Sequence, residues 1–137
     1  MEAHLSLDDQ TFMDQFRIGK LDAQIFTHEA HLRLAWLHIR KFGELVALEN
    51  ITGQIIHYVT LLGARDKYNE TLTIAAVKTV KHFMDKRGIG DFQEFINTYP
   101  RLKFQFKDLL LQHYKVDIFN NEKAKSEFVE PDLMPFS

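Results

Sequence analysis

Apolar residues recur along this chain at the three-to-four-residue spacing of amphipathic helices, and residues that cap or end helices separate the segments. Ser6 is a candidate cap for a first helix, and Thr27 followed by Glu29 is the clearest helix start. Gly19 and Gly43 follow two of these segments, as is common at helix ends. The pattern predicts four longer helices at about residues 7–18, 28–42, 44–62 and 69–87.

Shorter helical segments follow the fourth helix, near residues 91–99, 102–114 and 122–128. No segment alternates apolar and polar residues as a strand does, and the chain has no hairpin signal and no repeat. Gly53 lies inside the third helix, where we expect it to let another helix approach closely. The sequence therefore predicts an all-α fold, a helical bundle of four longer and several short helices.

The C-terminal segment differs from the rest of the chain, because its two X-Pro steps favour extended backbone. We expect a single domain over residues 1–137, with a helical body at about 5–114 and an extended arm at about 115–137. The arm is expected to pack over its own bundle. Exchange of the arm with a second copy, which would give a homodimer, is the alternative.

Composition narrows the function classes further. Hydrophobic residues make up 45% and charged residues 26%, which is ordinary for a globular protein, and the net charge of −2 gives no basic excess for nucleic acid. The first residues lack the features of a secretory signal, and no apolar run reaches the roughly 18–20 residues of a membrane span. We therefore expect a cytoplasmic protein with no nucleic-acid or membrane partner.

Two histidines near the start of the second helix form the first candidate site. His28 and His31 are three residues apart, so both imidazoles can reach one metal ion or substrate. The spacing is one residue short of the zincin motif His-Glu-x-x-His, and the Glu-x-x-His pair of di-iron bundles is absent. Since the chain has no cysteine, a bound divalent ion would have nitrogen and oxygen ligands only. The alternative is a pair of hydrogen-bonded histidines with a structural role.

A second polar cluster lies at the start of the fourth helix. Glu70 flanks the apolar stripe of that helix, where a carboxylate would need a positive or hydrogen-bonding partner. Lys67 and Tyr68 precede it and are candidates for orienting a small polar or anionic substrate. The simpler interpretation is a helix start, with Asn69 as the cap and Glu70 facing the helix dipole.

Three segments resemble blocks of a family of small bacterial helical proteins to which no activity has been assigned. The segment Phe26-Thr-His-Glu-Ala-His-Leu resembles Phe-x-His-x-x-His-Leu, Lys67-Tyr-Asn-Glu-Thr resembles Lys-Tyr-His-Glu-Thr, and Phe128-Val-Glu-Pro-Asp resembles Phe-Val-x-Pro-Asp. The resemblance covers residues 26–134 and implies a shared site that joins the first two blocks. Asn69 stands where the family has histidine, and asparagine is a poor ligand for transition metals.

Two functions follow from these patterns. In the first, His28, His31 and Glu70 bind a metal ion or act as acid–base groups in a small enzyme, with Lys67 and Tyr68 positioning the substrate. In the second, the protein is a non-catalytic module that binds a small ligand or a partner, and its polar cluster is structural. The sequence does not decide between them.

Overall fold

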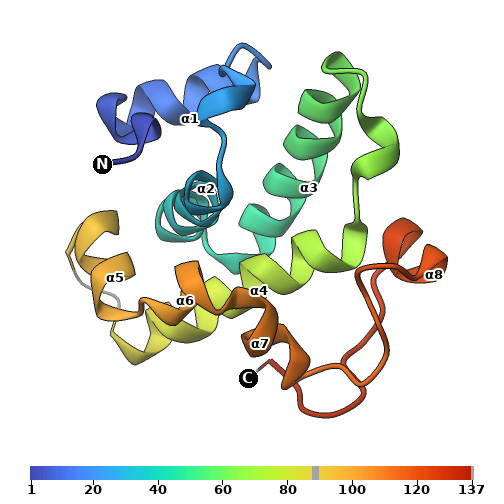
Figure 1. Cartoon of the computed structure of the whole chain (residues 1–137). Coiled ribbons are helices and arrows are strands. Elements are labelled where there is room, and N and C mark those ends of the chain that lie inside the picture. The colour runs from blue at the N-terminus through green and yellow to red at the C-terminus, as the bar shows by residue number, and fades with distance from the viewer. Residues whose placement is uncertain (88–89, 137) are drawn as a thin grey trace. The chain divides into compact units, whose positions relative to one another are not determined.

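The computed structural model describes residues 1–87 and 90–136, and all regular elements in these ranges are helical (Figure 1). The all-α prediction is therefore confirmed for the described residues. In chain order the elements are the 3-10 helix η1 (Ala3–Ser6), α1 (Asp9–Arg17), η2 (Ala23–Ile25), α2 (His28–Phe42), α3 (Glu44–Leu61), η3 (Arg65–Lys67), α4 (Glu70–Lys86), α5 (Phe92–Thr98), α6 (Arg101–Phe104), α7 (Phe106–Leu111) and α8 (Glu122–Ser126).

The chain divides into two compact units, Met1–Tyr68 and Asn69–Ser137. The first unit contains η1 to η3, and the second contains α4 to α8 and the C-terminal segment. The prediction of one domain over the whole chain stays a prediction.

The first unit is built around α2. This helix packs against α3, and α1 contacts both of them. All residues from Leu32 to Ile39 are buried, a run of more than two helical turns, so α2 is covered on every side. From α1, Phe12 and Phe16 are completely buried, as their shared helix face predicts. Polar groups on this part of α2 therefore need partners inside the protein.

Most predicted helix caps are present. The Thr27 hydroxyl accepts a hydrogen bond from the Ala30 amide at the start of α2, and Gly43 ends this helix with a φ of 83°. Ser6 was the predicted cap of the first helix, and this prediction is wrong. Ser6 lies at the end of η1, while the Asp8 carboxylate caps α1 by accepting from the Thr11 amide at 2.8 Å.

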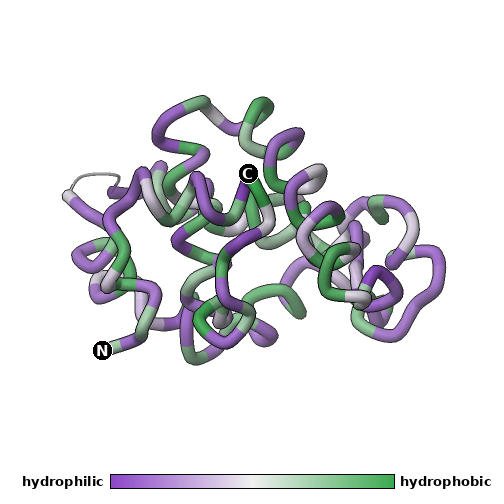
Figure 2. Tube along the Cα trace, turned by 90° about the horizontal axis from the view of Figure 1, so that it is seen from above, coloured by the Kyte–Doolittle hydropathy of each residue, from purple (hydrophilic) through white to green (hydrophobic). Residues whose placement is uncertain are grey.

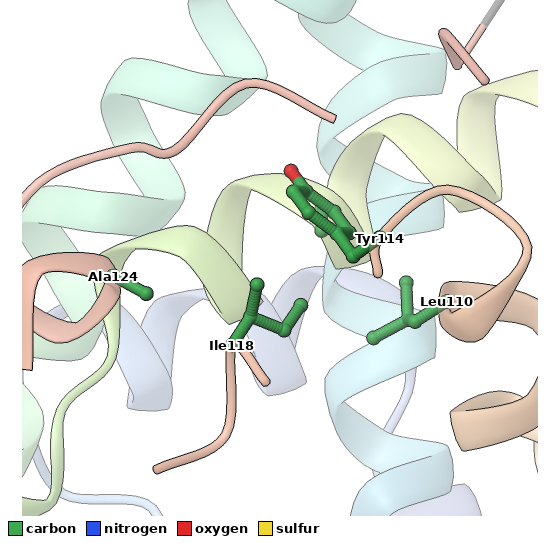
Figure 3. Close-up of a cluster of buried hydrophobic side chains, with 5 residues drawn as sticks. Leu110, Tyr114, Ile118 and Ala124 are labelled. Atoms are coloured by element: carbon green, nitrogen blue, oxygen red, sulfur yellow. The ribbon is translucent and has the colours of Figure 1, made fainter. Parts of the chain in front are cut away.

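The core of the second unit is an apolar cluster around α4 (Figure 3). Ala75 of α4 is completely buried against Leu110, Tyr114, Ile118 and Ala124. Hydrogen bonds from Asn69 and Thr71 connect the start of α4 to the C-terminal half of the unit. Asn69 caps α4 and also donates to the Ile118 carbonyl at 2.9 Å.

The C-terminal arm lies against its own unit, as expected. The Tyr114 hydroxyl donates to the Val129 carbonyl at 2.7 Å, and the Leu133 amide donates to the His113 carbonyl at 3.0 Å. The rings of His113 and Phe136 stack with their centroids 4.2 Å apart.

Two details of the predicted pattern are wrong. The helix predicted over residues 102–114 is interrupted at Gln105, whose ψ of 35° is not helical, and α6 and α7 lie on its two sides. A Cβ placed on Gly53 would meet no described atom within 4 Å, so this glycine does not serve a close helix contact.

Hydrophilic and hydrophobic residues interleave along the chain (Figure 2). Within the described ranges, no helix has both the length and the apolar character that crossing a membrane requires.

Candidate functional site

The His28–His31 pair lies at the start of α2, as predicted. His28 is the first helical residue after the Thr27 cap, and both histidines are exposed. Their spacing of three residues places them on neighbouring positions of one helix face. The pair is therefore open to a ligand from solvent.

The ring of His31 is held in one orientation by two contacts. Its Nδ1 lies 2.8 Å from the Thr27 carbonyl oxygen, and its ring stacks on Phe26 with the centroids 3.8 Å apart. Because a carbonyl oxygen only accepts, Nδ1 carries the proton, and Nε2 keeps its lone pair. Among the described residues, no hydrogen bond to His31 Nε2 is formed.

The electrostatic environment keeps this ring neutral. The pKa of His31 is lowered to about 4, mainly by desolvation; the Thr27 hydrogen bond opposes this effect, and the charge of His28 adds to it. The residue is nevertheless exposed, so water screens the ring and the effect on stability is small. At neutral pH the imidazole is a fixed neutral donor of an electron pair.

The other predicted site residues lie in the stretch of chain where the first unit ends and the second begins. Lys67 ends η3 and is exposed, whereas Tyr68 is only 5% exposed. The Arg65 guanidinium lies over the Tyr68 ring, 5.3 Å from its centroid. Glu70 is the first residue of α4 and is partly buried. Since His28 and His31 belong to the first unit and Glu70 to the second, the joint site stays a prediction.

Asn69 has the capping role that the simpler interpretation gave it. Its Oδ1 accepts from the Leu72 amide at 2.9 Å, and its Nδ2 donates to the Ile118 carbonyl at the same distance. Both ends of the amide are therefore used inside the second unit.

A second cluster of ligand-type side chains was not predicted. One ligand atom from each of Glu2, His4 and Glu29 lies within 4.8 Å of the others, so the three could hold a metal ion. The His4 side chain is completely buried, and its Nε2 lies 2.6 Å from Glu29 Oε2. Glu2 Oε1 lies 3.8 Å from the same nitrogen and also accepts a hydrogen bond from the Thr27 hydroxyl.

The neighbouring arginine makes this cluster a better internal network than a metal site. Arg33 is 4% exposed and donates to the carbonyl oxygens of His4 and Leu7 at 2.7 and 2.9 Å, and to Asp9 at 2.9 Å. Its Nη1 also lies 3.4 Å from His4 Nδ1. A guanidinium only donates, so it favours an unprotonated Nδ1 and a protonated Nε2 that donates to Glu29. A metal on Nε2 would reverse this tautomer and add positive charge beside Arg33.

The sequence contains one signal that points to this network. Glu29 and Arg33 are four residues apart in a helix that continues with four apolar residues, Leu34 to Leu37, which cover a full turn. Charged side chains in a fully buried helix require partners. The partner, His4, lies 25 residues before Glu29, and helical periodicity carries no information about a contact at that separation.

Comparison with known proteins adds no assignment: no family model, no curated protein and no solved structure matches this chain. The similarity to a bacterial family therefore stays a prediction from the three sequence blocks.

Proposed function

We propose that this protein binds a divalent metal ion at the start of α2, with His31 and His28 as nitrogen ligands. The proposal includes a small polar or anionic substrate bound at that ion. The observation that carries it is the hydrogen bond between His31 Nδ1 and the Thr27 carbonyl. In metal-binding histidines, a backbone or carboxylate acceptor commonly fixes one ring nitrogen and leaves the other for the metal.

The surroundings of the pair support a ligand role over a catalytic base. A general base works best when its pKa is near the operating pH, and a pKa of about 4 for His31 is well below neutrality. A ligand must be neutral, and this ring has no proton to lose from Nε2 at neutral pH. Imidazole ligands suit zinc, nickel, copper and iron, so Zn²⁺ is the natural first probe.

Calorimetric titration of the untagged protein with ZnCl₂ tests the proposal. We expect one site per chain, and a loss of affinity of roughly tenfold or more in His31→Gln, comparable to the effect of disturbing a metal site. His57→Gln is the matched control, since His57 is an exposed histidine of α3. Equal affinity in wild type and in the double variant His28→Gln/His31→Gln would overturn the proposal.

The same titration separates the alternative donors. Glu2→Gln removes a carboxylate from the unpredicted cluster, and a loss of Zn²⁺ binding in this variant alone would place the ion there. Glu70→Gln tests the sequence prediction that this carboxylate belongs to the donor set. Exposed Glu49 provides the control substitution, Glu49→Gln.

A further inference from the structure

A pocket of about 220 Å³ opens in the first unit, and none of the residues proposed to bind the metal ion lines it. Its lining comes from α1, α2 and α3. Met13 and Phe42 contribute apolar surface, and His38, Asn50 and Gln54 contribute polar side chains. Pockets for drug-sized ligands usually measure roughly 300–1,000 Å³, so this one suits a smaller molecule.

His38 lines this pocket, and one of its ring nitrogens is a hydrogen-bond donor that has no partner among the described residues. The residue is 2% exposed, and its Nδ1 lies 3.4 Å from Asn50 Nδ2. An amide nitrogen donates, so Nδ1 is the acceptor and the proton of the neutral ring lies on Nε2. This buried Nε2 has no hydrogen-bond partner among the described residues. Leaving a buried donor unpaired is unfavourable, and a partner that accepted from it would be favoured.

Gln54 presents the complementary acceptor. Its Oε1 is buried and lacks a hydrogen-bond partner among the described residues. Gln54 follows Asn50 by four residues on α3, so the two side chains occupy the same helix face. Neither Gln54 Oε1 nor His38 Nε2 is in contact with solvent, so a ligand that bonds both atoms requires side chains that line the pocket to move. Movement of Gln54 breaks no hydrogen bond of its Oε1.

We propose that this pocket binds a small molecule that carries a carboxamide edge. The carbonyl oxygen of the ligand accepts from His38 Nε2, its N–H donates to Gln54 Oε1, and its apolar body contacts Met13 and Phe42. A carboxylate has no donor for Gln54 Oε1, and an ammonium group has no acceptor for His38 Nε2. Arg17, Lys41 and Asp14 also line the pocket, and their two positive charges against one negative charge disfavour a cationic ligand.

Benzamide is the probe for this proposal, and protein-detected NMR titration measures its binding. We expect saturable shifts confined to α1, α2 and α3, with benzoate and N,N-dimethylbenzamide binding roughly tenfold more weakly because each lacks the donor. The lactam 2-piperidone presents the same pair of C=O and N–H groups within a ring. Its affinity relative to that of benzamide shows whether the pocket prefers a cyclic or a primary amide. Equal affinities for benzamide and N,N-dimethylbenzamide, or no saturation by benzamide, would overturn the proposal and leave water as the occupant.

Two variants localise the effect. Gln54→Met keeps the length of the side chain and removes the acceptor, so benzamide affinity is expected to fall by roughly tenfold. Gln93→Met is the control at an exposed glutamine of α5. Nitrogen-15 NMR of the His38 ring provides a readout that needs no ligand: Nε2 should be the protonated nitrogen at neutral pH. A proton on Nδ1 would contradict the proposal.

Discussion

His4 Nε2 and Glu29 Oε2 lie 2.6 Å apart, although 25 residues separate them in the chain. Both side chains are buried, and Arg33 donates to the backbone of the segment that carries His4. This contact attaches η1 to α2 and pairs the buried side chains of His4 and Glu29 with each other. It is a structural network of the kind that the second functional hypothesis expected, at different residues.

Replacing His4 with phenylalanine should lower the free energy of unfolding by about 1–3 kcal/mol, because the buried Glu29 carboxylate loses its hydrogen bond to His4. Urea unfolding followed by circular dichroism measures the change. The double variant His4→Phe/Glu29→Leu should recover part of the loss, since the buried carboxylate is then removed as well. The matched control is His82→Phe at an exposed position of α4. A loss below about 0.5 kcal/mol in His4→Phe would contradict a structural role for the pair.

The stability of the protein should depend on pH through His38. Desolvation, helped by the charge of Lys41, lowers the pKa of His38 from 6.5 to about 4. The unfolded chain therefore takes up a proton first as the pH falls, and stability is lost between pH 6.5 and about 4. The corresponding loss is at most on the order of 3 kcal/mol. In His38→Gln the pH dependence over this window should be shallower than in wild type and in His57→Gln, by urea unfolding at fixed pH values. Parallel profiles for all three proteins would rule out this contribution.

Replacing Gly53 or Gly19 with alanine should change the stability of the protein in opposite directions. Gly53 lies inside α3 and has open space around it, so Gly53→Ala should raise the free energy of unfolding by up to about 1 kcal/mol. Gly19 has a φ of 78°, and an added Cβ would come within 2.3 Å of Leu61 Cδ1. Gly19→Ala should therefore be destabilising by more than about 1 kcal/mol. Thermal melts of the two variants measure both effects, and equal changes would contradict the assignment of strain to Gly19.

Tyr114 should hold the C-terminal arm through its hydroxyl group. Tyr114→Phe removes the hydrogen bond to the Val129 carbonyl and should lower stability by about 1 kcal/mol. Hydrogen exchange should become faster at the Leu133 amide, and should stay unchanged in η1 of the first unit. Tyr99→Phe serves as the control. Unchanged exchange at Leu133 would show that the arm is held independently of this bond.

The ionisation of Tyr114 should lower the stability of the protein at alkaline pH. Desolvation and the charges of Glu130 and Asp132 raise the pKa of Tyr114 from 10.0 to about 12. Folding therefore favours the protonated phenol, and its contribution is complete below pH 10 and is lost as the pH rises towards 12. Stability measured from pH 9 to 11.5 should fall more steeply in wild type than in Tyr114→Phe. Identical slopes would contradict the contribution of this residue.

Local signals in the sequence were sufficient for most helices but not for every boundary. Thr27 and Asn69 cap the helices they were predicted to cap, because a cap hydrogen bond joins residues only three positions apart. The interruption at Gln105 had no such signal, since glutamine is a good helix former and its neighbours continue the helical pattern.

The candidate site also combines features that local sequence signals predict with features that they do not. His28 and His31 can be predicted as a pair because both lie on one turn of one helix. The His4–Glu29 contact and the pocket beside His38 depend on how separate helices pack, and one sequence does not specify that packing.

The separation of bonded partners along the chain also sets an order of assembly during synthesis. Thr27, Glu29 and Arg33 leave the ribosome about 1–6 s after their partners Glu2 and His4, at ordinary rates of translation. The start of α4 waits longer, because the Thr71 hydroxyl bonds the Glu127 carbonyl and the Val129 amide, 56 and 58 residues further along. The first unit can therefore close its polar contacts before residues 127–129 are made, and α4 receives these partners only after them.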